Sequence, residues 1–357
     1  MRIDPQKTFY KEKSKMNNFN NNYYTPPSVQ PPNVDLKKAK YTYSIIGFSL
    51  CAIIVVVYIL STILSETLSE DSWFLTSPWG FWIINYLPVY GIAIPIGIFF
   101  MTLAPSSPPE KRGMEGKAFF FALCIMFFFT SVGNIVGNML AAYLSNGTAE
   151  NAVAELAMST NPLKIVVMVI LAPIIEEYVF RKQIIDRTVR YGEKTAVLFS
   201  GLLFGLFHTN LFQFFYAFLG GALFAYIYVR SGRLRYPILL HAIINFNGAV
   251  IAPYFLSKMS EFQKLHELDP MTQEAEINEL VTKLMPISTL LMVYYVVFFG
   301  LAITGLVMYI LHRKRVRWQP AKEQLPHTAI ANTVYMNAGI ITFVTVTTAL
   351  TIISLFS

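Results

Sequence analysis

The amino-acid sequence predicts an all-α, polytopic bundle of about eight to nine transmembrane helices with a cytoplasmic N-terminus. Three observations lead to this fold class. Of the 357 residues, 54% are hydrophobic and 14% are charged, and the mean hydropathy is +0.48, whereas roughly 25% of the residues in soluble domains are charged. The apolar residues also come in runs long enough to cross a bilayer. The basic residues, in turn, concentrate in alternate connections between those runs, which is the positive-inside pattern.

The apolar runs give nine candidate spans. They cover 43–65, 80–104, 118–144, 163–180, 195–208, 211–229, 237–256, 286–311 and 329–355. A helix needs roughly 20 residues to cross the bilayer, so the run 195–208 is too short to cross alone. We therefore expect 195–208 and 211–229 to form a tilted hairpin whose turn, at His208, Thr209 and Asn210, lies in a polar cavity. Irregular backbone at membrane depth is tolerated only in such a place.

The Lys and Arg residues set the expected orientation. With the N-terminus inside, the inner segments hold 24 of the 28 Lys and Arg residues, and the outer segments hold only Lys164, Lys258, Lys264 and Lys283. This asymmetry predicts a multi-pass protein of the cell membrane, and the Asn- and Lys-rich tail favours a bacterial plasma membrane. Basic loops beside anionic lipid account for the net charge of +7. Membrane lipid is therefore an expected partner and nucleic acid is not.

The chain divides into five expected segments. They are a disordered cytoplasmic tail (1–40), N-terminal transmembrane helices (41–145), a catalytic helical core (160–256), an extracytoplasmic acidic segment (257–285) and C-terminal transmembrane helices (286–357). The tail is rich in Asn and Pro and cannot bury a core. The acidic segment is expected to hold a short amphipathic helix. The core differs from the other segments because ionisable and amide side chains enter its apolar helices.

The first unusual motif of the core is a pair of adjacent glutamates, Glu176 and Glu177, followed by Arg181. A charged residue inside a bilayer costs roughly 2.5–3.5 kcal/mol on insertion scales, so such a pair is unlikely to be incidental. Residues four apart share a helix face, which allows Glu177 to pair with Arg181. Glu176 is left on another face without a partner in its helix. An unpaired carboxylate in an apolar site is a candidate general base.

Two further motifs follow on separate helices. Phe204 precedes His208 by four residues, and His241 precedes Asn245 by four. Each motif alone also fits a purely structural role, since a histidine at the end of a span commonly lies in a turn or an interface. Together with Glu176, two imidazoles and an amide can activate a water and stabilise an oxyanion. The same cluster could instead form a proton or ion relay.

The order Glu-Glu-x-x-x-Arg, Phe-x-x-x-His, His-x-x-x-Asn resembles the CAAX-protease and bacteriocin-processing family of intramembrane endopeptidases. This family is also called Abi and includes the type II CAAX prenyl endopeptidases. The resemblance covers about 160–250 and includes all three motifs. It implies that Glu176 activates the attacking water with help from His208, and that His241 and Asn245 stabilise the oxyanion.

The resemblance also assigns supporting residues and bears on the cofactor. It implies that Glu177 and Arg181 hold their helix in place, and Phe204 belongs to the supporting set as part of its motif. The sequence has no His-Glu-x-x-His zinc motif, and a metal-free mechanism is expected. The alternative is a zinc ion held by Glu176, His208 and His241, because two His and one Glu can ligate zinc.

The expected function is therefore an intramembrane endopeptidase that hydrolyses a peptide bond of a membrane-associated peptide or protein. Secreted peptide pheromones or bacteriocin precursors are candidate substrates. One alternative is a non-enzymatic scaffold, immunity or regulatory protein of the same fold, which loss of motif residues would have favoured. Another is a proton-coupled transporter, which predicts ion flux without peptide products. The sequence leaves the oligomeric state open.

Overall fold

The computed structural model describes residues 34–269 and 271–356, and it confirms the all-α class. Every regular element in these ranges is helical. The first of them, α2 (Leu36–Thr67), is capped by Asp35, whose carboxylate accepts hydrogen bonds from the backbone N–H groups of Lys37 and Lys38. The helix thus begins several residues before the boundary at 41 that we expected. The rest of the expected disordered tail, residues 1–33, lies outside the described residues.

Seven helices in the described part of the chain are long and apolar enough to span a bilayer. They are α2, α4–η1–α5 (Pro78–Pro88, Val89–Ala93, Ile94–Met101), α6 (Gly116–Leu144), α11 (Leu211–Ser231), α12–η5–α13 (Arg235–Phe246, Asn247–Ile251, Ala252–Glu267), α14 (Glu274–His312) and α16 (Ala338–Phe356). Their outer faces are apolar, with Phe99 and Val296 64% and 68% exposed. Such a surface suits lipid rather than water.

The other two expected spans are also helical, in a less regular form. Residues 163–180 fall in a run of π- and α-helix made of η2 (Ile165–Leu171), α8 (Ala172–Glu177) and η3 (Tyr178–Ile185), which continues into α9 (Asp186–Thr188) and η4 (Val189–Tyr191). Residues 195–208 form α10 (Glu193–Phe207), which has only 15 residues. The remaining short elements are α3 (Trp73–Thr76), α7 (Ala152–Met158), η6 (Arg313–Arg315), α15 (His327–Ile330) and η7 (Ala331–Tyr335).

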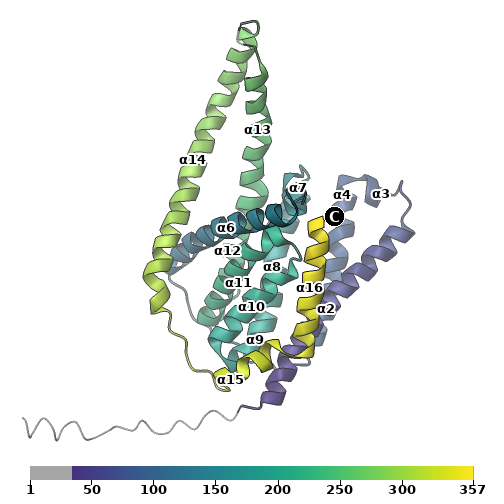
Figure 1. The fold of residues 1–357 in the computed structure, drawn as a ribbon, viewed down its shortest axis with the longest axis vertical. Helices are drawn as coiled ribbons and strands as arrows, with labels where there is room; N and C mark the ends of the chain where they lie inside the picture. The colour runs from purple at the N-terminus through teal and green to yellow at the C-terminus, as the bar shows by residue number, and fades with distance from the viewer. Residues whose placement is uncertain (1–33, 270, 357) are drawn as a thin grey trace, which may run out of the picture. The chain divides into compact units, whose positions relative to one another are not determined.

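The predicted hairpin of 195–208 and 211–229 is confirmed. Helices α10 and α11 pack against each other along their lengths (Figure 1). Thr209 adopts a positive φ of 47°, a conformation uncommon for a β-branched residue, and Asn210 caps α11 by accepting from the N–H of Phe212 at 2.9 Å. The turn is half-buried, and Ser354 of α16 donates a hydrogen bond to the Thr209 carbonyl at 3.1 Å.

The acidic segment 257–285, which we expected to hold a short amphipathic helix, is helical over most of its length. Helix α13 continues through it to Glu267, and α14 begins at Glu274. These two helices form a hairpin that extends away from the other helices (Figure 1). Glu261 of α13 contacts Lys258 at 2.8 Å and Lys283 of α14 at 2.9 Å, which ties the two arms together. The polar composition therefore belongs to long helices.

Three prolines explain the π-helical turns η1, η2 and η5. Pro95, Pro173 and Pro253 each stand near the start of an α-helical piece, directly after η1, η2 and η5 respectively. Proline has no N–H to donate, and its ring clashes with the carbonyl four residues earlier. A wider turn before the proline relieves that clash while the helix continues. Such π-bulges often occur at functional sites, and Pro173 lies three residues before Glu176.

Small residues bring several helices into close contact. Helix α2 packs against α16, and α6 packs against both α11 and α14 (Figure 1). A Cβ atom on Gly47 would lie 2.3 Å from the carbonyl carbon of Gly339, and one on Gly305 would lie 2.0 Å from the carbonyl oxygen of Cys124. The N–H of Gly339 also donates to Ser44 Oγ at 3.0 Å. Small residues at such crossings are typical of membrane helices.

The connection after α14 ties the later helices to α10. The N–H groups of Glu323 and Leu325 donate to the carbonyls of Arg190 and Tyr191, each at 3.0 Å, and the Glu323 carboxylate pairs with Arg190. Beside this contact, Glu193 at the start of α10 pairs with Arg230 at 2.7 Å. These contacts hold the base of α10 in place, and α10 carries Phe204 at its other end.

Candidate active site

A buried ion pair forms the base of the site. Arg181 Nε lies 2.8 Å from Glu177 Oε2, and both side chains are fully buried. The predicted pairing of these two residues is therefore confirmed. The guanidinium also lies over the rings of Phe204 and Phe224, at 4.6 and 5.6 Å from their centroids. Within the described residues its nitrogens have no partner with hydrogen-bond geometry, so Glu177 and the two ring faces balance its charge.

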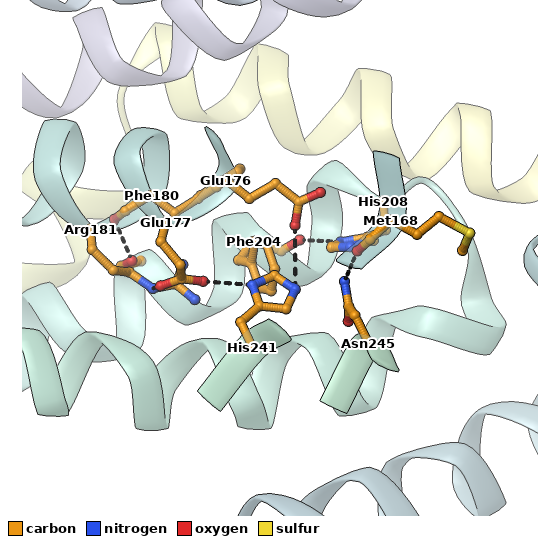
Figure 2. Close-up of polar contacts among 10 residues, drawn as sticks. Met168, Glu176, Glu177, Phe180, Arg181, Phe204, His208, His241 and Asn245 are labelled. Atoms are coloured by element: carbon orange, nitrogen blue, oxygen red, sulfur yellow. Dashed lines mark hydrogen bonds and ion pairs between the residues drawn. The ribbon is translucent and has the colours of Figure 1, made fainter. Parts of the chain in front are cut away.

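Glu177 has a second partner that the sequence did not predict. Its Oε1 lies 3.0 Å from Nδ1 of His241, on α12 (Figure 2). A neutral imidazole with its proton on Nδ1 donates to this carboxylate and leaves Nε2 as an acceptor. Glu177 thus links the arginine to the histidine and orients the ring. The rings of Phe204 and Phe224 also pack against His241, with centroids 5.8 and 5.4 Å away.

Glu176 lies in a different environment from its neighbour. Its side chain is 23% exposed, and its Oε2 is 3.8 Å from Nε2 of His241. That distance is too long for a direct hydrogen bond, and a gap of this length between two polar atoms suits a bridging water. Figure 2 shows Glu176 and Glu177 approaching His241 from the same helical run, each beside a different ring nitrogen. The two adjacent carboxylates are therefore not equivalent.

His208 ends α10 beside the other site residues. Its Nδ1 lies 2.7 Å from the carbonyl oxygen of Phe204, a contact that requires a proton on Nδ1 and leaves Nε2 free to accept. The imidazole is within electrostatic range of both Glu176 and His241. Phe204 explains the spacing of its motif: it packs edge-on against His208 at 4.8 Å and supports Arg181 and His241 as described above. Phe204 is thus the apolar centre of the site.

Asn245 completes a broken helix. Its Nδ2 donates to the carbonyl oxygen of Met168 at 2.8 Å. In the wide turn η2, the N–H of Ala172 bonds to Val167, and Pro173 has no N–H, so neither of these residues serves the Met168 carbonyl. Buried carbonyls need a donor, and the side chain of Asn245 supplies one. The contact fastens α12 to the helix of Glu176, and the second hydrogen of the amide remains available.

The site thus brings together all seven residues that the sequence singled out, from the η2–α8–η3 run, α10 and α12. It adds two that sequence reasoning missed. Phe224 of α11 packs on Arg181 and His241, and it belongs to none of the three sequence motifs. Met168 contributes only its carbonyl, and the proline five residues later was the available signal.

A zinc site was the alternative to a metal-free one. In residues 34–269 and 271–356, no group of three or more His, Cys, Asp or Glu side chains is placed to hold a metal ion. His241 Nδ1 lies 3.0 Å from Glu177, and its Nε2 lies 3.8 Å from Glu176, an arrangement that fits a bridging water and also the carboxylate-oriented histidine of a metal site. The metal-free mechanism therefore stays a prediction, with zinc held by Glu176, His208 and His241 as its alternative.

The same region of the chain is similar to a known protein family. Residues 158–247 match the family model described as type II CAAX prenyl endopeptidase Rce1-like. The chain is 29% identical over 224 residues to a Bacillus subtilis (strain 168) protein named "Putative membrane peptidase YdiL", which covers 60% of this chain and 73% of that protein.

A second relative matches a shorter stretch. The chain is 37% identical over 94 residues to the "Membrane-embedded CAAX protease MroQ" of Staphylococcus aureus (strain USA300). This match covers 24% of the chain and 37% of that protein. No solved structure matches the chain.

Proposed function

We propose that the protein is an intramembrane endopeptidase in which Glu176 activates the attacking water. Residues 158–247 match the Rce1-like type II CAAX prenyl endopeptidase family model, and they lie in a chain with seven helices long and apolar enough to span a bilayer. The family and the two relatives support a membrane protease. The choice of Glu176 rests on one observation, the contrast between the two adjacent carboxylates. Glu177 is fully buried and engaged by Arg181 and His241, whereas Glu176 is partly exposed and faces His241 across a gap.

The proposed reaction follows from these positions. A water between Glu176 and the Nε2 edge of His241 gives a proton to Glu176 as it attacks the scissile carbonyl. His208 accepts through its free Nε2 and helps to orient that water. For His241 to stabilise the oxyanion, its ring carries a proton on both nitrogens before the attack, with the Nδ1 proton held by Glu177. Its Nε2–H and the free hydrogen of the Asn245 amide then donate to the oxyanion and stay on their residues throughout. Glu176 then returns its proton to the leaving amine.

The substrate is proposed as a membrane-associated peptide or protein. The site lies among helices that span the bilayer, and such a location favours a substrate that is itself held at the membrane. Precursors of secreted peptides, which carry an apolar leader or tail, have this property. Charge placement predicts that the inner ends of these helices face the cytoplasm, so the proposed cut is made near the cytoplasmic face. Metal-free hydrolysis is part of the proposal.

The test compares wild type with Glu176→Gln in nanodiscs, using a library of quenched peptides with and without a chelator. Loss of a general base is expected to lower turnover by roughly 10²–10⁴-fold, and the chelator is expected to leave wild type active. Glu155→Gln, an exposed acid on α7, is the matched control and should keep full activity. Equal cleavage by wild type and Glu176→Gln would overturn the role of Glu176, and zinc-reversible loss in chelator would overturn the metal-free mechanism.

A further inference from the structure

The place of His208 among the reacting groups depends on how the end of α10 is held. In the described part of the chain, the hydrogen bond and the ring packing of His208 both go to Phe204, four residues earlier in the same helix. The next residue, Thr209, has a positive φ of 47°. A β-branched residue keeps such a backbone only where the surrounding structure holds it. The turn that follows His208 therefore needs support from other helices.

The last turn of α16 packs against this α10–α11 turn. Leu355 is buried, although its neighbours Ile353 and Phe356 are 62% and 66% exposed. Its side chain lies in an apolar cluster with Ala141 of α6 and Phe212, the second residue of α11. Leu355 thus joins the last helix of the chain to α6 and to the start of α11.

Two further contacts limit the movement of the turn. The hydroxyl of Ser354 lies 3.1 Å from the carbonyl oxygen of Thr209 and 3.0 Å from that of Thr351 in its own helix, so one hydrogen serves two acceptors. On the side of α6, a Cβ atom on Gly137 would lie 2.9 Å from the carbonyl oxygen of Phe212. The turn is therefore close-packed against α6 and bound by the end of α16.

The C-terminal part of the chain also holds the other end of α10. The N–H of Gln319 donates to the Glu193 carboxylate at 2.8 Å, and the N–H of Leu325 donates to the carbonyl of Tyr191 at 3.0 Å. Helix α16 packs against α10 between these two ends (Figure 1). All of these contacts come from residues that follow the region matched to the family model.

We propose that Leu355 and Ser354 are positioning residues, which hold His208 at the water of the proposed reaction by bracing the turn behind it. The proposal rests on the proposed endopeptidase function, in which His208 orients that water. It makes the last turn of α16 part of the catalytic apparatus. The competing role for this turn is a general contribution to stability.

The first experiment compares Leu355→Ala with Ile353→Ala in nanodiscs, using a peptide that wild type cleaves. Leu355→Ala should lower kcat by up to about 10²-fold, the cost of a misplacement of roughly 1 Å, and leave KM nearly unchanged. Leu355→Met, which keeps the apolar volume, should restore most of the rate. Ile353→Ala removes an exposed apolar side chain from the same turn and should behave as wild type. Equal losses in Leu355→Ala and Ile353→Ala would overturn the proposal.

A double-mutant cycle separates positioning from stability. In a His208→Gln background, Leu355→Ala should lower the residual kcat little further, because the side chain that it positions is already absent. The same fold-loss in both backgrounds would show that Leu355 does not act through His208, and the proposal would fail.

A measurement without substrate keeps this test independent of the protease assignment. The chain has five histidines, so NMR of protein labelled with ¹⁵N-histidine gives few ring signals, and His208→Gln assigns that of His208. Leu355→Ala should shift the His208 signal and leave that of His312 unchanged, whereas Ile353→Ala should change neither. This result in a protein that cleaves nothing supports the brace and refutes only the proposed function. An unchanged His208 signal, or a shift of every histidine, overturns the brace.

Discussion

Replacing Glu177 by glutamine is expected to destabilise the fold strongly, although the residue next to it is the proposed catalytic base. Glu177 and Arg181 are both fully buried and 2.8 Å apart. The substitution leaves the Arg181 guanidinium buried without a counter-ion and with no hydrogen-bond partner in the described part of the chain. Removing one member of a buried pair costs roughly 3–5 kcal/mol. The ring faces of Phe204 and Phe224 remain in place, so they offset none of this loss.

The assay is unfolding in mixed micelles by SDS, followed by circular dichroism and tryptophan fluorescence. The control is Glu176→Gln, whose side chain is 23% exposed and 3.8 Å from its one ion-pair partner in the described residues, His241. Its free energy of unfolding is expected to stay within about 0.5 kcal/mol of wild type, as for a surface change. The two adjacent carboxylates should thus have different effects: Glu177→Gln lowers the free energy of unfolding, and Glu176→Gln lowers turnover.

A double variant tests the reason for the loss. In Glu177→Gln combined with Arg181→Met no charge remains buried without a partner, and replacing both members of a buried pair by uncharged groups is often nearly neutral. The double variant is therefore expected to be more stable than Glu177→Gln alone. The reasoning is refuted if Glu177→Gln unfolds like wild type, or if Arg181→Met adds its own loss to that of Glu177→Gln instead of recovering stability.

Three further results are expected. Asn245→Leu should lower the free energy of unfolding by about 1–3 kcal/mol, because the half-buried Met168 carbonyl loses its donor. An unchanged unfolding curve would contradict that role. Gly305→Ala should disrupt the packing of α14 on α6 and lower the melting temperature measured by differential scanning fluorimetry. Gly300→Ala is the control, because the space around its Cβ position is open, and it should leave the melting temperature unchanged. The predicted orientation places residue 272 outside the cell and residue 322 in the cytoplasm. Thr272→Cys should therefore react with an impermeant maleimide in intact cells, and Lys322→Cys should react only after permeabilisation. The reverse result would invert the topology.

Contacts within one helix could be predicted from the sequence, and contacts between helices largely could not. The pairing of Glu177 with Arg181 follows from their spacing of four residues. The contact of Glu177 with His241 joins residues 64 apart in the sequence, and periodicity gives no information about which helix faces which. The separate position of Glu176 was nevertheless predictable, because adjacent helical residues point about 100° apart.

Composition indicated the polarity of one segment but not the length of its helices. The polar residues of 257–285 predicted one short amphipathic helix. Helices that leave the bilayer can be equally polar, and the contact of Glu261 with Lys283 links two such helices. The hairpin at 195–231 was predictable for a different reason, since α10 is too short to cross the bilayer and needs a neighbour. Length was thus the more reliable signal than composition.

The contact between α2 and α16 has a consequence for how the protein is made. The hydrogen bond from Gly339 to Ser44 joins residues 295 apart, so the ribosome produces one partner long before the other. Until α16 emerges, α2 presents the surface around Gly47 to lipid without its close-packed neighbour. The helices that carry the candidate site, from η2 to α12, are made between these two partners. The contact between α2 and α16 therefore forms only after the helices that lie between them in the sequence have been made.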